Sequence, residues 1–209
     1  MKRLLFIFVA MMGIMSAHSQ TTDNKELLTS LLTLNDDSLF SKGIGYISSG
    51  ENTKALLCFQ LAAKNGHANS QAYTGLCYAE GIGVEQNQRT ALEWFAKAAE
   101  QDNALAETYI GACYTDGIVV EKDAQKAFFW FEKAAKQGYV MAQYLVGLCY
   151  ENGEGVEKNI EEAKLWYGSA AGEGNEKAQE RLDALLAEEG SNDVLDIVED
   201  EDDVDANSH

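Results

Sequence analysis

Residues 75–99 read GLCYAEGIGVEQNQRTALEWFAKAA, and the chain contains this stretch three times. The other copies are GACYTDGIVVEKDAQKAFFWFEKAA at 111–135 and GLCYENGEGVEKNIEEAKLWYGSAA at 147–171, each offset by 36 residues without a gap. Ten positions are identical in all three copies, among them a Tyr, a Trp and an Ala-Ala pair. Self-similarity at a fixed period of this size indicates an array of stacked repeats.

Each copy predicts two helices joined by a tight turn. The segment from Ala68 to Ala79 has apolar residues at helical spacing and precedes two glycines, Gly81 and Gly83. Glycine readily adopts the positive φ that a helix C-terminus and a tight turn need. In residues 91–99 the apolar positions are i, i+1, i+3, i+4, i+7 and i+8, which fits one broad helical face and does not fit a strand.

The second helix of each copy has its own start signal. Asn87 stands where an N-cap is expected, and Asp123 and Asn159 occupy the equivalent places. Large aromatic residues such as Tyr78 and Trp94 are expected to fill the space between the helices. Because no single helix pair can bury its whole apolar face, the pairs must stack on one another.

This pattern of glycines, Tyr, Trp and Ala-Ala resembles the Sel-one-like repeat (SLR), a relative of the tetratricopeptide repeat. The resemblance covers residues 66–174 closely. It implies an all-α fold, an α-solenoid of antiparallel helix pairs in a right-handed superhelix with 36-residue repeats. Two departures from the pattern stand out. Val119 replaces the second loop glycine of the middle copy, which predicts a tighter or differently closed turn there. The cysteines that precede the repeated Tyr are not at the positions associated with disulfide-bonded members.

The remaining segments extend this organisation on both sides. Residues 38–67 match at the same offset, with Cys58 in the place of the Trp and a shorter turn near Gly50, and predict a degenerate first repeat. Amphipathic patterns predict capping helices at both ends of the array. The expected segments are a signal peptide at 1–19, an N-terminal capping helix within 20–37 (Asp23 to Leu34), the degenerate repeat at 38–67, repeats at 68–103, 104–139 and 140–174, a C-terminal capping helix at 175–189, and an acidic, disordered tail at 190–209.

The first 19 residues have the features of an export signal. Lys2 and Arg3 form a short positive region, and Leu4 to Met15 is a twelve-residue apolar core, too short for a spanning helix of about 20 residues. Ala17 and Ser19 supply small residues for cleavage before Gln20. We therefore expect an exported protein, periplasmic or extracellular, that is not inserted in the membrane after cleavage.

The composition argues against a nucleic-acid partner. The net charge of the 209-residue chain is −18, and removal of Lys2 and Arg3 would make it −20. Residues 188–205 carry ten acidic side chains, which leaves about −10 on the rest of the mature chain. Such a body repels phosphate backbones and anionic membrane surfaces, and the chain has no basic patch.

The four cysteines are expected to be mainly free core residues. Cys77, Cys113 and Cys149 occupy equivalent positions on successive first helices, whose axes should lie about 8–10 Å apart. A disulfide needs Cα atoms within about 7 Å, so these three should not be bridged to one another. The pair Cys58–Cys77 stays open as a possible bridge, because the second helix of one unit contacts the first helix of the next.

The sequence offers little for catalysis or cofactor binding. After cleavage only His67 and His209 remain, so a Ser or Cys nucleophile has almost no histidine base available. No Cys-x-x-Cys or His-x-x-x-His spacing supports a metal site, and the Gly-x-Gly turns lack the continuation that a phosphate loop requires. We therefore predict no enzymatic activity, no cofactor and no metal.

Two functional hypotheses remain. The favoured one is an exported, non-enzymatic scaffold that binds a peptide or protein partner of unknown identity. The alternative is an exported hydrolase acting on cell-wall material, or an enzyme inhibitor, in which acids such as Asp116 and Glu151 would do acid–base work. The alternative requires a fixed carboxylate pair in a cleft, and the sequence identifies none.

The resemblance to tetratricopeptide solenoids also implies a location for the partner. In those solenoids ligands lie along the concave face, on the first helix of each repeat. Most of the corresponding positions differ between the three copies, as expected for a surface that binds a non-repeating ligand. The predicted partner-binding residues are Asn69, Ala72, Leu105, Thr108, Met141, Tyr144, Leu148 and Glu151, with Leu76, Ala79, Ala112 and Thr115 in the same registers.

Overall fold

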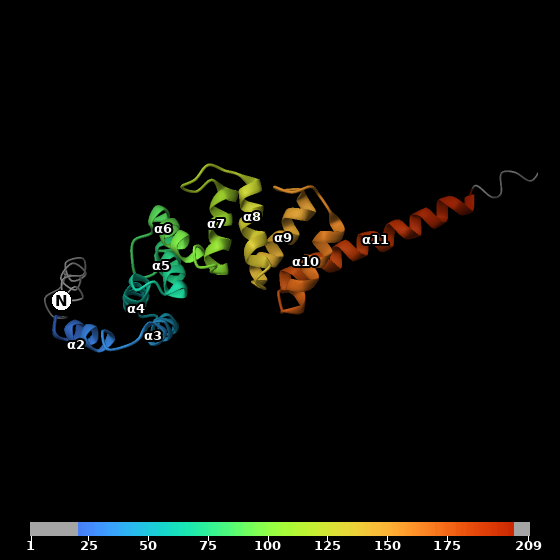
Figure 1. Ribbon diagram of the computed structural model, residues 1–209. Coiled ribbons are helices and arrows are strands. Elements are labelled where there is room, and N and C mark those ends of the chain that lie inside the picture. Colours follow the sequence, from blue (N-terminus) through green and yellow to red (C-terminus); the bar gives the residue numbers. More distant parts are fainter. Residues whose placement is uncertain (1–20, 203–209) are drawn as a thin grey trace, which may run out of the picture.

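The computed structural model describes residues 21–202, with side chains described for residues 25–189. This part of the chain contains ten helices and no strand, in an elongated stack with α2 at one end and α11 projecting from the other (Figure 1). The prediction of an all-α solenoid is therefore confirmed. The predicted signal peptide and the last residues of the predicted tail, 203–209, lie outside the described residues.

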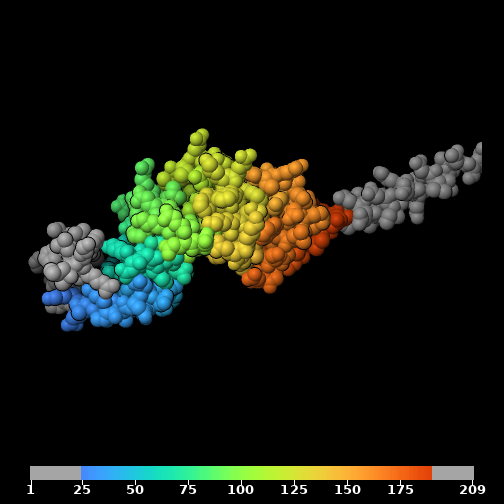
Figure 2. All heavy atoms as spheres, in the orientation of Figure 1, coloured from blue at the N-terminus to red at the C-terminus, as the bar shows by residue number. Residues whose placement is uncertain are grey.

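The helices alternate with short connections along the chain. Their bounds are α2 Thr21–Leu31, α3 Asp36–Ser48, α4 Asn52–Lys64, α5 Ala68–Glu80, α6 Gln88–Ala99, α7 Ala104–Asp116, α8 Ala124–Ala135, α9 Val140–Asn152, α10 Ile160–Gly172 and α11 Glu176–Asp202. Four helix pairs follow α2: α3–α4, α5–α6, α7–α8 and α9–α10. We call the first helix of each pair its A helix and the second its B helix. Each B helix also packs against the next A helix, and α10 packs against α11, so the pairs form one continuous body (Figure 2).

The predicted helix ends are confirmed. The side-chain oxygens of Asn87, Asp123 and Asn159 each accept a hydrogen bond from the backbone N–H three residues on, at 3.0–3.1 Å. The A helices α5, α7 and α9 each end at a glycine in the left-handed conformation, with φ of 71–73°. These signals are local in sequence, which explains why the sequence predicts them well.

A glycine in each A helix allows the two helices of a pair to approach closely. A Cβ atom added to Gly111 would lie 2.5 Å from the Phe131 ring, and one added to Gly147 would lie 2.5 Å from the Tyr167 ring. Phe131 and Tyr167 are 4% and 0% exposed. The large ring on the B helix therefore occupies the space that a side chain on the A helix would fill, and this contact recurs in all four pairs.

Two predicted segment boundaries differ from the structure. The N-terminal helix spans Thr21–Leu31 rather than Asp23 to Leu34; its buried Leu31 packs beside Leu39, at the end of the stack. At the other end, α11 continues to Asp202, thirteen residues beyond the predicted end of the capping helix at Glu189. The tail was predicted to be disordered because its charges repel, but residues 190–202 contain no proline and have apolar residues at helical spacing, at Val194, Leu195, Ile197 and Val198.

The cysteines are free in the structure. Cys58, Cys77, Cys113 and Cys149 are all buried and unbridged, so the alternative of a Cys58–Cys77 disulfide is not realised here. Burial raises the pKa of the Cys58 and Cys77 thiols to about 11 and that of Cys149 to about 12. Since the thiolate is the reactive form, the folded protein should protect its cysteines from alkylation.

We therefore expect iodoacetamide at about pH 8 to label the native protein very slowly. After unfolding in denaturant without a reductant, all four thiols should react, as counted by intact mass. Fast labelling of the native protein, or fewer than four reactive thiols in the unfolded protein, would contradict this arrangement.

Candidate protein-binding surface

The A helices form the inner side of the stack. Helix α5 contacts α7, and α7 contacts α9, whereas no comparable contact joins the B helices α6, α8 and α10 in the described part of the chain. Helices that lie closer together in successive repeats line the concave side of a solenoid. The A helices are therefore the elements that would present a concave binding surface.

Four of the predicted partner-binding residues are buried and cannot form part of this surface: Ala72, Ala79, Thr108 and Glu151. Ala72 is fully buried in the core, and Thr108 is 6% exposed, with its hydroxyl donating to the Ala104 carbonyl. Glu151 is 8% exposed. The prediction of these four as surface residues was wrong, because each of these A helices is covered by its own B helix and by the B helix of the preceding pair. Helix α9 is covered in addition by Arg181 of α11.

Glu151 has a structural role between the last repeat and the capping helix. Its Oε2 accepts a hydrogen bond from the Tyr167 hydroxyl at 2.6 Å, and its carboxylate forms an ion pair with Arg181 of α11. Arg181 lies 30 residues away in sequence, so the repeat pattern contained no sign of this contact. Glu151 therefore joins the capping helix to the array.

The other predicted residues are at least partly accessible, and Leu76, Ala112 and Thr115 are among them. Asn69 is exposed, and its Oδ1 accepts a hydrogen bond from Asn103 of the next repeat at 2.8 Å. Met141 is 49% exposed. Leu105, Tyr144 and Leu148 are half-buried and pack against the core.

A group of tyrosines on the A-helix side was not predicted. Tyr73 and Tyr109 occupy equivalent positions on α5 and α7, and Tyr139 immediately precedes α9. The pKa of Tyr109 is raised mainly by burial, and then by the charge of Glu80 and by the neighbouring Tyr139. The pKa of Tyr139 is raised by burial and by the neighbouring Tyr73. These couplings place residues of two successive repeats near one another on the A-helix side. A signal was present in the sequence, since Tyr73 and Tyr109 are separated by the 36-residue period and directly follow the predicted Ala72 and Thr108.

Buried polar contacts hold the repeats in register behind this surface. Gln101 donates to Gln71 at 2.8 Å, and Gln137 donates to Glu107 at 2.6 Å, which is the same contact one repeat later. Glu107 is fully buried and lies 2.7 Å from the Lys133 ammonium of α8. These contacts tie an A helix to its own B helix and to the connection that leads to the next A helix.

The acids considered for catalysis are not arranged as a pair. Asp116 is exposed at the end of α7, whereas Glu151 is buried against Tyr167 and Arg181. Within the described residues no group of three or more His, Cys, Asp or Glu side chains is placed to hold a metal ion. None of the helices described here is both long enough and apolar enough to cross a bilayer.

Comparison with known proteins points to one family. The chain matches the Sel1 repeat over four consecutive segments, residues 38–67, 68–103, 104–139 and 140–175. The structure of a Sel1 repeat protein from Oxalobacter formigenes is 32% identical in sequence, with a TM-score of 0.65; the match covers 71% of this chain and 62% of that chain. No curated protein matches the chain.

Two further structures have similar folds. The first is c5321, a protective antigen present in uropathogenic Escherichia coli strains that displays an SLR fold; it is 28% identical with a TM-score of 0.67, over 78% of this chain and 36% of that one. The second is cysteine rich protein B of Helicobacter pylori, 22% identical with a TM-score of 0.52, over 62% of this chain and 96% of that one. The chain thus spans less than two thirds of the first two proteins.

Proposed function

Because the chain belongs to the Sel1 repeat family, whose members are typically protein–protein interaction scaffolds, we propose that it binds a protein or peptide partner on its concave surface. The surface is defined by the accessible residues of α5, α7 and the start of α9. We propose no catalytic role, since the carboxylates considered for one are engaged elsewhere or isolated.

The convergence of Tyr73, Tyr109 and Tyr139 is the observation that carries this proposal. These three half-buried tyrosines come from two successive repeats and lie within electrostatic reach of one another on the A-helix side. Tyrosine is enriched in protein interfaces because it combines a large apolar ring with a hydrogen-bonding group. The exposed Met141 adds an adaptable apolar side chain on the A helix that follows.

Export is the second part of the proposal. It rests on the sequence, namely the positive Lys2-Arg3 pair, the short apolar core and the small residues before Gln20. The partner would then be a periplasmic or extracellular protein, or a segment of one. An intact mass that begins at Gln20 in the exported protein is the expected result, and retention of Met1 there would contradict it.

The concave-surface proposal is tested with a double variant that keeps the fold, Tyr109→Phe with Met141→Glu. The change removes one hydroxyl group and places a charge on the surface. A hot-spot loss of about 1–2 kcal/mol corresponds to a loss of affinity of about 5- to 30-fold. Proteins captured from the native envelope or secreted fraction by the wild-type protein should be lost with this variant.

The matched control is Leu165→Glu on the B helix α10, at a side chain that is 66% exposed. This variant should capture the same partner as the wild type. If the double variant retains the partner and Leu165→Glu loses it, binding occurs on the B-helix side and the concave-surface proposal is wrong.

A further inference from the structure

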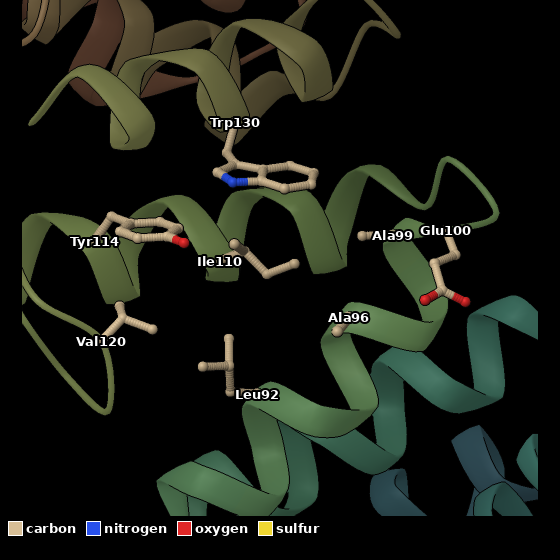
Figure 3. Close-up of a pocket in the computed structure, with 8 residues that line it drawn as sticks. All are labelled: Leu92, Ala96, Ala99, Glu100, Ile110, Tyr114, Val120 and Trp130. Atoms are coloured by element: carbon tan, nitrogen blue, oxygen red, sulfur yellow. The ribbon is translucent and has the colours of Figure 1, made fainter. Parts of the chain in front are cut away.

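An apolar groove of about 400 Å³ lies between the B helices α6 and α8 (Figure 3). Leu92 and Ala96 of α6 form one wall, Trp130 of α8 forms the other, and Ile110 and Tyr114 of α7 lie between them. The groove is on the side of the molecule formed by the B helices, away from the tyrosine cluster. Its volume lies near the lower end of the range for ligand pockets, about 300–1,000 Å³.

The equivalent spaces in the neighbouring repeats are filled by larger side chains. Ala96 corresponds to Gln60 one repeat earlier, where the Gln60 amide donates to the hydroxyl of Tyr78 at 3.2 Å. Leu92 corresponds to Phe128 one repeat later, where the Phe128 ring meets the Tyr150 ring edge-on, with centroids 5.3 Å apart. The repeat at 68–103 has the small Ala96 together with Leu92, which leaves space beside Tyr114.

Val119 stands at a loop position that has no room for a side chain in the other copies. In the first and third copies this loop position is glycine, and a Cβ atom there would lie 2.5 Å from the Asn52 carbonyl oxygen or 2.0 Å from that of Ala124. Those loops therefore approach the start of the preceding B helix more closely than a side chain permits. Val119 keeps the same positive φ, 66°, and a Cβ held as closely as in those copies would meet the start of α6 at Gln88.

The valine that follows this loop position is packed differently in the middle copy. Val84 and Val156, which follow the loop glycines, pack against the hydrophobic core. The equivalent Val120 lines one end of the groove instead (Figure 3). Ile118 and Val119 beside it are 37% and 44% exposed, which are high values for large apolar residues.

The far end of the groove carries a negative charge that the other repeats lack. Glu100 lies at this end, opposite Val120, whereas lysines occupy the equivalent positions, Lys64 and Lys136 (Figure 3). The nearby Lys133 is already paired with Asp102 and Glu107. Among the residues with described side chains, Glu100 has no ion-pair partner.

We propose that this groove docks a basic peptide segment, in which a bulky apolar side chain enters between Leu92 and Trp130 and an adjacent Lys or Arg pairs with Glu100. The apolar lining of the groove fits the bulky apolar side chain of the peptide. The unpaired Glu100 carboxylate, on a chain with a net charge of −18, attracts its Lys or Arg. This second binding surface is independent of the concave surface.

The test uses the full chain, methyl-labelled, titrated with the capped peptide acetyl-Gly-Phe-Arg-Gly-amide and followed by NMR. The methyl signals of Leu92, Ile110 and Val120 should shift with saturation at millimolar peptide. The peptide with Glu in place of Arg should bind about fivefold more weakly, as expected for one exposed ion pair. The peptide with Ala in place of Phe should cause no shift at these methyl groups.

Three variants of the protein make the test specific. Ala96→Gln introduces the residue of the preceding repeat and should fill the groove and abolish the shifts. Val119→Gly should let the loop approach α6 and should thereby abolish peptide binding. It should also raise the denaturation midpoint, because a branched side chain no longer occupies a position with positive φ. Glu100→Lys introduces the residue of both neighbours and should remove the preference for the Arg peptide.

Several outcomes would overturn the proposal. These are the absence of peptide-induced shifts at the three methyl groups, equal binding by Ala96→Gln, or an unchanged Arg preference in Glu100→Lys. Concentration-dependent shifts of the same methyl groups without peptide would identify a second copy of the chain as the occupant. In that case the proposal of a basic peptide as the ligand of this groove would be wrong.

Discussion

Replacement of Phe131 by alanine is expected to lower the free energy of unfolding by about 3–5 kcal/mol. The Phe131 ring is 4% exposed and occupies the space over Gly111, which has no side chain that could move to fill the resulting cavity. The ring lies in the hydrophobic core of the middle repeats, so its loss weakens the contacts of α8 with α7. Because each repeat contacts only its neighbours, we expect the array to unfold from this point.

A second phenylalanine, two positions earlier on the same helix, provides a control of the same type. Phe129 is 56% exposed, and Phe129→Ala should change the free energy of unfolding by no more than about 0.5 kcal/mol. Guanidinium unfolding followed by circular dichroism and by tryptophan fluorescence would measure both variants. Equal losses in the two variants would mean that the contact between ring and glycine does not hold the pair together.

The sequence predicts the helix pairs well because their determinants are local and repeated. The N-cap residues, the left-handed glycines at helix ends and the apolar spacing each act within a few residues. The period of 36 residues then fixes which helices are equivalent. Together these features were sufficient for the fold class and for the helix starts at Asn87, Asp123 and Asn159.

The exposed face of the A helices could not be predicted in the same way. These helices contain small and apolar residues on nearly every side, because they contact their own B helix, the preceding B helix and other A helices. Periodicity therefore did not distinguish the buried Ala72 and Thr108 from the accessible Tyr73 and Tyr109. The burial of Glu151 depends on Arg181 from a helix outside the repeats.

The groove beside Ala96 depends on differences between repeats, not on what they share. Val119 was recognised as a departure from the pattern, but its effect depends on how closely the loop glycines approach the preceding B helix in the other copies. The charge reversal from Lys64 and Lys136 to Glu100 is visible in the sequence. A role for this charge in peptide binding can be inferred only from the structure, in which Glu100 lies at the end of an apolar groove.

The second large effect is expected for Lys133→Met, which should lower the free energy of unfolding by about 3 kcal/mol. Glu107 is fully buried, and the Lys133 ammonium lies 2.7 Å from its carboxylate and 2.8 Å from Asp102. Hydrogen bonds to Asp102 and then to Glu107 raise the pKa of Lys133, so this stabilisation is complete at neutral pH and is lost as the pH rises through the pKa of the folded state. Methionine would leave the Glu107 carboxylate buried without a cation.

A double variant separates this charge effect from loss of packing. Glu107→Gln in the Lys133→Met background should recover much of the stability, because a neutral amide next to Gln137 is far less costly to bury than a carboxylate. Lys136→Met is the matched control, since Lys136 pairs with Glu132 at the surface and contributes at most about 0.5 kcal/mol. Chemical denaturation at neutral pH would measure all three variants. If the double variant is no more stable than Lys133→Met, the aliphatic part of Lys133 rather than its charge holds α7 and α8 in register.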